Sequence, residues 1–312
     1  MDYSVVIPLF NERDNLAPLH AELTRVMQAL GRPYELVFVD DGSSDGGIEV
    51  LRDLKASDSC LHVIRLARNS GQTAALACGF KHASGEVIVA MDADLQNDPA
   101  DIPRLLASLD QGNDLASGWR TARWQKERFT RRLPSIAANS LISAMTGVRL
   151  HDYGCTFKAY RRELAQSLDL YGEMHRFVPA IAAEQGARIA EVEVGFRQRR
   201  AGTSKYGLGR IVRTLLDLIT VKFLSGYSTA PIQFFGLIGF LLGGLGSIWT
   251  AILVAEKIVL GHPLGNRPAL LLAVLLVVVG VQFVSIGLLG EMLARTYHES
   301  QGKPIYIIKE EF

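Results

Sequence analysis

The sequence is poor in cysteine, has almost no net charge, and lacks the common glycine-rich phosphate motifs. The three cysteines, Cys60, Cys78 and Cys155, are an odd number without metal-ligand spacing, which argues against a disulfide scaffold and suits reduced thiols in a cytoplasmic domain. A net charge of +1 argues against a globally basic protein, so no nucleic-acid partner is expected. No Gly-x-Gly-x-x-Gly follows the first expected strand and no Walker A lysine motif occurs, which argues against NAD-dependent and P-loop enzymes. The N-terminus has no basic segment, so no secretory signal peptide is expected.

Charged residues are also missing from two long stretches near the C-terminus. None occurs in the 24 residues Ile232–Ala255 or in the 22 residues Ala269–Gly290. At a rise of about 1.5 Å per residue, each stretch is longer than the hydrocarbon core of a bilayer, about 30 Å. A pair of buried core helices is the alternative, but such helices usually have a polar face or end after about 14 residues. The sequence therefore predicts two transmembrane helices, at 232–255 and 269–290.

The polar residues around these helices predict their orientation. The linker Glu256–Arg267 is short, so the helices should form a hairpin with both chain ends on one side. Seven Lys and Arg residues lie between Arg197 and Lys222 against one acid, whereas the linker carries two. By the positive-inside rule, the large domain should face the cytoplasm, in a multi-pass protein of the cytoplasmic (inner) membrane. The expected order is a cytoplasmic domain (1–206), an interfacial amphipathic helix (207–230), the transmembrane pair (231–294) and a cytoplasmic tail (295–312).

Short β-branched runs alternate with amphipathic stretches through the first third of the chain. This rhythm predicts βαβ units and an α/β, Rossmann-like domain with a mainly parallel sheet. Asn11 is expected to cap the first helix, and Asp98 with Pro99 to start the fourth. The expected strands are SVVIPL, ELVFVD, LHVIRL and EVIVAMD, each followed by a helix (12–30, 45–56, 71–82 and 99–111), with a last strand near Ile189–Val194.

Acidic and polar side chains follow three of these strands, at the edge where ligands bind in open α/β sheets. Asp92, Asp94 and Gln96 come just after the fourth strand, and alternate residues there place oxygen atoms on one side, as a hard divalent cation requires. A lone Asp-x-Asp is weak evidence, because such pairs are often helix caps or solvated turns. A second pair, Asp40 and Asp41, ends a neighbouring strand, and so many carboxylates would repel a diphosphate unless a cation neutralised them.

Seven stretches in this order resemble the family 2 glycosyltransferases of the GT-A fold, in particular the polyisoprenyl-phosphate hexosyltransferases. These include dolichyl-phosphate mannose synthases and bacterial undecaprenyl-phosphate glucosyl and aminoarabinosyl transferases. With the two C-terminal helices, the resemblance covers nearly the whole chain. The stretches are VVIPLFNE (5–12), VDDGSSD (39–45), RNSGQTAAL (68–76), MDADLQNDP (91–99), DYGCTFKAYRR (152–162), MHRFVP (174–179) and AGTSKY (201–206).

The resemblance implies roles for particular residues on the donor side. Asp94 and Gln96 would bind a Mg²⁺ or Mn²⁺ that bridges the diphosphate of a nucleotide sugar and stabilises charge on the departing nucleotide. Asn69 and Gln72 match a segment near the donor, although a glycine-flanked polar loop is equally consistent with a structural turn. The residues that would line the donor site are Pro8, Phe10, Asn11, Glu12, Asp40, Asp41, Asn69, Gln72 and Asp92.

The resemblance implies two catalytic residues, Asp94 through the metal that it would bind and Asp152 as a candidate base for the acceptor. A phosphate monoester has a second pKa of about 6, however, so a lipid phosphate is already a nucleophile near neutral pH, and Asp152 would instead orient the sugar or an arginine. The acceptor phosphate needs cations, and the basic stretch 120–132 and Lys205 can supply them. The residues expected there are Arg120, Arg128, Arg132 and Lys205, with His175 and Arg176 as further candidates near the donor sugar or acceptor.

The resemblance implies an inverting transfer from a nucleotide diphosphate sugar, with UDP as the family-level expectation, to a polyisoprenyl phosphate. Undecaprenyl phosphate is the expected lipid in a bacterium, for lipopolysaccharide or other envelope glycan modification. A processive polysaccharide synthase is the first alternative, but its Q-x-x-R-W motif and extra spans are missing. A non-catalytic membrane scaffold is the second. The small residues of the first span favour close helix contact, within the hairpin or in a homo-oligomer such as a tetramer.

Overall fold

The computed structural model describes the chain except residues 122–142, 144–146, 171–173, 198–230, 261–267 and 301–305. It divides the chain into two compact units. The first comprises Met1–Leu218 together with Pro304–Phe312, and the second comprises Ile219–Lys303. The C-terminal residues therefore belong to the first unit, although the chain reaches them only after the second.

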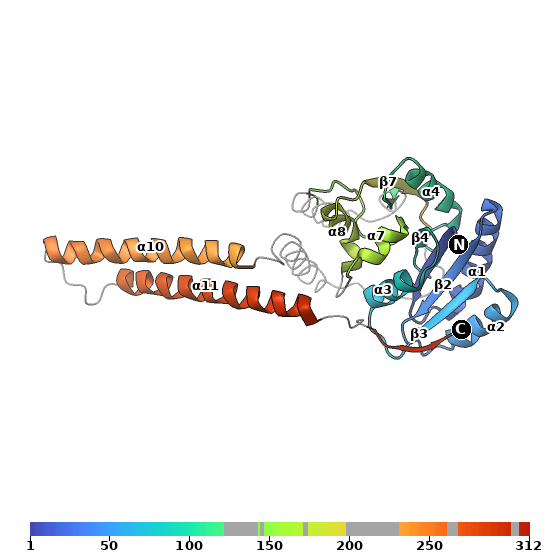
Figure 1. Cartoon of the computed structure of the whole chain (residues 1–312), viewed down its shortest axis with the longest axis horizontal. Helices are drawn as coiled ribbons and strands as arrows, with labels where there is room; N and C mark the ends of the chain where they lie inside the picture. The colour runs from blue at the N-terminus through green and yellow to red at the C-terminus, as the bar shows by residue number, and fades with distance from the viewer. Residues whose placement is uncertain (122–142, 144–146, 171–173, 198–230, 261–267, 301–305) are drawn as a thin grey trace. The chain divides into compact units, whose positions relative to one another are not determined.

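The first unit contains an eight-stranded sheet with the order β7-β5-β6-β4-β1-β2-β3-β8 (Figure 1). Strands β1 to β4 are parallel to one another, β6 and β8 are antiparallel to their neighbours, and β7 is parallel to β5. The strands are β1 (Tyr3–Leu9), β2 (Tyr34–Asp40), β3 (Leu61–Leu66), β4 (Val87–Ala90), β5 (Leu115–Arg120), β6 (Lys158–Arg161), β7 (Ile189–Val194) and β8 (Ile308–Glu311).

Helices cover both faces of this sheet because alternate strand residues point to opposite sides. On one face, Val5 and Ile7 of β1 join a buried cluster with Leu16 and Leu23 of α1. On the other, Gly79 of α3 lies so close that an added Cβ would come within 2.3 Å of Val6 Cγ1. The helices are α1 (Arg13–Leu30), α2 (Gly47–Ser57), α3 (Gln72–His82), α4 (Ile102–Asp110), α7 (Arg162–Ser167) and α8 (Val178–Glu184), with short 3₁₀ turns η1 (Pro99–Asp101) and η2 (Met174–Arg176).

The predicted alternation of strands and helices in the first 111 residues is confirmed, and the boundaries agree to within a few residues. The strand expected at Ile189–Val194 is β7. Asp98 accepts a hydrogen bond from the backbone N–H of Ala100 at 3.0 Å, as expected of a cap, but Pro99 opens the 3₁₀ turn η1 and α4 begins only at Ile102. Asn11 does not cap α1, because the helix starts after Glu12 and Asn11 has a left-handed backbone with φ of 56°.

The structure differs from the expectation of a plain tail at residues 295–312. Helix α11 continues to Ser300, and Ile308–Glu311 form strand β8, which pairs antiparallel with β3 at the edge of the sheet (Figure 1). Backbone bonds extend the pairing beyond the strand itself, since Val63 and Phe312 exchange N–H···O bonds of 2.8 and 2.9 Å. The strand completes the sheet by covering the edge that β3 would otherwise expose.

The second unit contains two long apolar helices that pack against each other, α10 (Pro231–Leu260) and α11 (Pro268–Ser300). The segments Phe235–Val259 and Pro268–Gly290 are long and apolar enough to cross a membrane, and most of their side chains are exposed. The helices approach closely at glycines, because a Cβ on Gly280 would lie 2.5 Å from the backbone N of Gly243. The small face of α10 thus serves the contact within the hairpin, and α10 extends through the first residues of the expected linker.

Candidate active site

The acidic residues after β2 and β4 lie on either side of β1, because β1 pairs with both strands. Leu9 aligns with Asp40 in one pair and Val6 with Ala90 in the other. The carboxyl ends of these three parallel strands therefore meet at one edge of the sheet, where open α/β sheets bind their ligands. The two acidic groups therefore meet at one edge, as the sequence predicted, but the expectation of neighbouring strands was wrong, because β1 lies between β2 and β4.

Asp41 holds the loop that follows β3. Its carboxylate accepts hydrogen bonds from the backbone N–H groups of Ser70 at 2.6 Å and Gly71 at 2.9 Å. Burial raises the pKa of Asp41, although the two N–H donors oppose the shift. The residues from Arg68 to Gly71, including the predicted donor residue Asn69, line an open hollow in the surface. Asp41 thus acts as the anchor of a concave loop next to Asp40.

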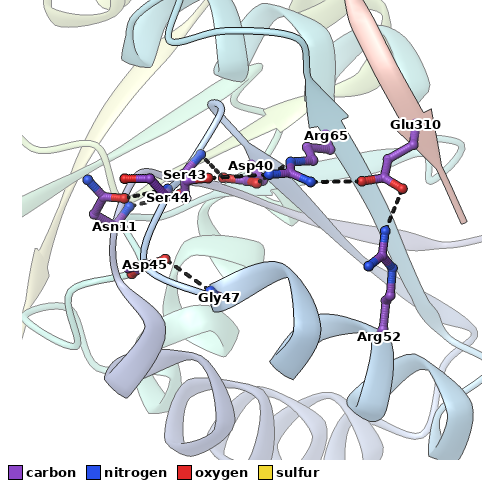
Figure 2. A network of polar contacts seen from close by, with 9 residues as sticks. All are labelled: Asn11, Asp40, Ser43, Ser44, Asp45, Gly47, Arg52, Arg65 and Glu310. Carbon is purple, nitrogen blue, oxygen red and sulfur yellow. Dashed lines mark hydrogen bonds and ion pairs between the residues drawn. The ribbon is translucent and has the colours of Figure 1, made fainter.

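The segment after β1 is fastened to the segment after β2 by hydrogen bonds between loops. The N–H of Asn11 donates to Ser43 Oγ, and the side-chain oxygen of Asn11 accepts from the N–H of Ser44, both at 2.9 Å. Figure 2 shows Asn11 beside Ser43 and Ser44. Because the Asn11 side chain is used here, it is not available for α1, which explains the missing helix cap.

The remaining predicted residues after β1 lie along the same edge. Pro8 is buried within the strand, opposite Val39 of β2. Phe10 is 37% exposed, so its ring is accessible to a ligand. Glu12 accepts a hydrogen bond of 2.6 Å from the side-chain amide of Asn15.

Asp92 connects three segments of the chain, because its side chain bonds to Gln72 in the stretch 68–76 and to Thr156 in the stretch 152–162. One carboxylate oxygen accepts from Gln72 Nε2 at 2.7 Å, and the other accepts from the hydroxyl of Thr156. Burial, followed by the charge of Asp94, raises the pKa of Asp92 to about 6, while Thr156 opposes the shift. The pairing with Asp92 brings the expected donor residue Gln72 into the same group as the Asp-x-Asp motif.

The oxygen donors after β4 fit a hard divalent cation. Asp94 accepts the N–H of Gln96 at 3.1 Å, and Leu95 between them has a left-handed backbone with φ of 59°. The charge of Asp94 disfavours the ionised form of Asp92, and a cation at this place would relieve that repulsion. Among the described residues, no three His, Cys, Asp or Glu side chains converge on one point, so a cation here would need further oxygen ligands from diphosphate and water.

Asp152 and Arg120 form a buried ion pair. Arg120 Nε and Nη2 donate to the two oxygens of Asp152 at 2.7 and 3.0 Å, in the planar arrangement that suits guanidinium and carboxylate. Arg120 is only 8% exposed, and Asp152 only 3%. This geometry places Asp152 to orient an arginine, which is one of the roles that the sequence left open, along with a catalytic base and orientation of the sugar.

Two side chains in DYGCTFKAYRR, the partly buried Thr156 and the buried Lys158, were not singled out by the sequence. Thr156 contacts Asp92 directly, and Lys158 donates to the carbonyl of Cys155 and, at 3.5 Å, to that of Tyr153. Burial lowers the pKa of Lys158, which lies close to Asp92, Asp152 and Arg120. No local signal in the motif marks Lys158 as buried, because its strand, KAYR, has a basic residue at each end.

Several residues that the sequence predicted for the acceptor or donor sugar are not among the site contacts described above. Arg128, Arg132 and Lys205 lie outside the described residues, as does the expected interfacial helix 207–230. His175 is buried and its ring Nδ1 is 2.7 Å from Thr73 Oγ1, so it joins η2 to α3. Arg176 is partly buried in the same turn. The basic group expected at the acceptor is represented in the described structure by Arg120.

Comparison with known proteins supports the resemblance in the sequence motifs. A family model described as glycosyl transferase family 2 matches residues 4–169. Dodecaprenyl-phosphate galacturonate synthase from Rhizobium johnstonii is 41% identical over 100% of this chain and 93% of its own length. Undecaprenyl-phosphate 4-deoxy-4-formamido-L-arabinose transferase from Aeromonas hydrophila is 36% identical over 98% of this chain and 93% of its own.

Solved structures show a related fold. Glucosyl-3-phosphoglycerate synthase from Mycobacterium tuberculosis, in complex with Mn²⁺, UDP-glucose and phosphoglyceric acid, has a TM-score of 0.54 and 21% identity over 72% of this chain and 79% of that chain. At this identity the likeness concerns the fold alone. It confirms the expected GT-A-like α/β domain.

Proposed function

This chain belongs to glycosyl transferase family 2, and we propose that it transfers a sugar from a nucleotide diphosphate sugar to the phosphate of a polyisoprenyl lipid. The observation that carries the proposal is the meeting of the Asp40–Asp41 and Asp92–Asp94 groups at one sheet edge, in a chain that also has two apolar helices. The named activities of relatives that match nearly the whole chain support the choice of acceptor.

The donor occupies the edge formed by β1, β2 and β4. Phe10, Asn11 and Asp41 lie around the nucleotide, the fully buried Asp40 holds the N–H of Ser43 beside it, and Gln72 holds Asp92 in place. Asp94 and Gln96 would hold a Mg²⁺ or Mn²⁺, and a cation there would supply positive charge that stabilises a departing nucleoside diphosphate. Asn69 belongs to the hollow beside Asp41, close to the path of the diphosphate. UDP is the nucleotide that we propose.

The acceptor phosphate needs no strong base, because its second pKa of about 6 makes it largely dianionic near neutral pH. A phosphate oxygen forms the new bond to the anomeric carbon while the bond to the nucleoside diphosphate breaks, with inversion at that carbon. Asp152 holds Arg120 through two of the five guanidinium donors, which leaves Arg120 donors that can face a phosphate. Arg128, Arg132 and Lys205 are the further phosphate ligands that we propose.

The two apolar helices keep the protein at the membrane that holds its lipid. We propose that α10 and α11 both span the bilayer and that the first unit faces the cytoplasm. The place of β8 in the sheet of the first unit supports an even number of crossings, because the chain must return to the side it left. A homo-oligomer would use the outward faces of the hairpin, since Gly239, Gly243 and Gly246 lie against α11.

The test is transfer of radiolabel from nucleotide sugars into organic-extractable lipid by the purified full-length protein with undecaprenyl phosphate. The donor panel contains UDP and GDP sugars, including UDP-galacturonate because one relative is named for galacturonate. We expect label in lipid with Mg²⁺ or Mn²⁺, none with EDTA, and a loss of at least about 10²-fold in Asp94→Ala.

Other outcomes identify the alternatives. Label in a polymer that stays in the aqueous phase would indicate a processive synthase. A folded protein that binds no nucleotide sugar with metal, and labels no lipid from any donor, would contradict the proposal and favour a membrane scaffold.

A further inference from the structure

We propose that Glu310, on the strand that follows the membrane hairpin, is a positioning residue of the donor-nucleotide site. It acts through Arg65 on Asp40 and on the loop Asp41–Ser44. The identity of the ligand in this proposal rests on the proposed function, whereas the contacts between the residues do not depend on it. Figure 2 shows Glu310, Arg65 and Asp40 with Ser43 and Ser44 of the loop and Arg52 of α2.

The three charged residues lie in register across three neighbouring strands. Asp40 of β2 aligns with Arg65 of β3, and Arg65 aligns with Glu310 of β8. Residues directly opposite one another on paired strands share a face of the sheet, so their side chains form a row of alternating charge. Arg65 occupies the middle of this row, between two carboxylates.

The contacts of Arg65 reach both ends of the row. Its Nη1 donates to Glu310 Oε1 at 3.1 Å, and its Nε lies 3.4 Å from Asp40 Oδ2. Its Nη2 is 3.4 Å from the backbone carbonyl of Ser43, whose N–H donates to Asp40 Oδ1 at 2.9 Å. One arginine therefore contacts both the buried acid at the end of β2 and the loop that the acid holds.

Arg65 is needed in this position because Asp40 is fully buried. Asp40 Oδ2 has no hydrogen bond from any of the described residues, so the Arg65 charge is the compensation that the structure gives it. A buried carboxylate without a nearby cation is costly, and the loop around it would shift to reach water. The placement of Arg65 thus determines how the loop 41–44 is held.

Glu310 fixes the placement of Arg65 from the outer side. Its second oxygen accepts from Arg52 Nη2 of α2 at 2.6 Å, so the carboxylate is held between two arginines. The hydrogen bond from Arg65, more than that from Arg52, lowers the pKa of Glu310 and keeps it ionised. The strand that carries Glu310 is itself fastened by backbone bonds to β3, including that from Ala67 N–H to Ile307 O at 2.8 Å.

The first test uses the full-length protein and needs no ligand. Hydrogen exchange measured by mass spectrometry on peptides that contain 41–45 should be faster in Glu310→Gln than in the native protein, by about threefold to tenfold, because the N–H of Ser43 depends on the position of Asp40. Glu311→Gln is the matched control, since it makes the same charge change on the adjacent residue, which points to the other sheet face. Equal exchange in the two variants would overturn the proposal.

The second test measures the donor. In the radiolabel assay, Glu310→Gln should raise KM for the nucleotide sugar by about threefold to tenfold with kcat little changed, and Glu311→Gln should change neither. In a protein that already carries Arg65→Gln, the Glu310→Gln change should not alter KM further, because Glu310 can no longer act through Arg65. An effect on KM that persists in the Arg65→Gln background would overturn the assigned path.

The two tests separate failure of this inference from failure of the proposed function. If the native protein transfers no sugar but Glu310→Gln alone loosens the loop, the geometric role stands and the assigned reaction is wrong. If the native protein is active and Glu310→Gln behaves like Glu311→Gln in both tests, Glu310 is only a surface residue of β8.

Discussion

Arg120 and Asp152 are best understood as one unit, because each is buried and each is the other's partner at 2.7 and 3.0 Å. Removal of one partner leaves a buried charge without its direct ion-pair partner, although Lys158 and Asp92 lie nearby. Such a loss costs about 3–5 kcal/mol when a buried pair is broken. Any loss of activity in a single variant therefore mixes a change in chemistry with a change in folding, and a pair of substitutions is needed to separate them.

We expect Asp152→Asn and Arg120→Gln each to lower activity and thermal stability, and the double variant to be no less active than the worse single variant. The reason is that Asp152 acts through Arg120, so its loss cannot matter once Arg120 is gone. The measurement is a double-mutant cycle on kcat/KM and on unfolding in detergent. If Asp152 removed a proton from the acceptor, the two losses of activity would instead multiply.

The sequence predicted which acidic groups meet at the candidate donor site, but not how their side chains are paired. Residue types and motif order were enough to select Asp40, Asp41, Asp92 and Asp94, because acids after parallel strands meet at one edge. The contacts of Asp92 with Gln72 and Thr156 could not be predicted, since they join segments far apart in the chain. Asn11 was predicted as a cap because its type favours caps, and a loop from β2 used its side chain instead.

At the scale of whole elements, the local pattern of apolar residues was enough to predict strands and helices where each strand is followed by its own helix. The strands β1 to β4 and helices α1 to α4 are built this way, and their boundaries were predicted closely. Strand β8 was not predicted, although the β-branched and aromatic run IYII (305–308) leads into it, because IKEE itself is short and mostly charged. Its strand conformation comes from pairing with β3, which no local pattern contains.

The contact between α10 and α11 gives a prediction for the hairpin. A Cβ on Gly280 would lie 2.5 Å from Gly243 N and 2.7 Å from Gly239 O, so Gly280→Ala must force the helices apart. We expect a loss of about 1–3 kcal/mol, as for overpacked cores, seen as a lower unfolding temperature in detergent micelles. Gly244→Ala is the control.

Nothing lies within 4 Å of the Cβ position at Gly244, and alanine favours helix by about 1 kcal/mol over glycine. That variant should be as stable as the native protein or more so. Equal loss in both variants would show that the glycines serve another purpose, such as contact between copies of the chain.

For the molecule as a whole, the proposed hairpin topology predicts which residues a reagent can label from each side of the membrane. A membrane-impermeant maleimide should label Lys257→Cys, near the end of α10, in intact cells, and should label Lys309→Cys on β8 only after the membrane is permeabilised. Both positions are exposed to solvent or lipid in the structure. Cys60 is replaced by serine beforehand, because it is partly exposed and belongs to the same unit as β8. Labelling of both positions in intact cells would contradict the hairpin topology.

The position of β8 also has a consequence for how the protein is made. A ribosome that adds roughly 5–20 residues per second releases β3 many seconds before it releases β8, and the two apolar helices are synthesised in between. During that interval the edge of β3 is open, and an open edge can pair with a strand of another chain. Chains that stop before β8 is made would keep this edge uncovered, so we expect such truncated chains to aggregate through β3.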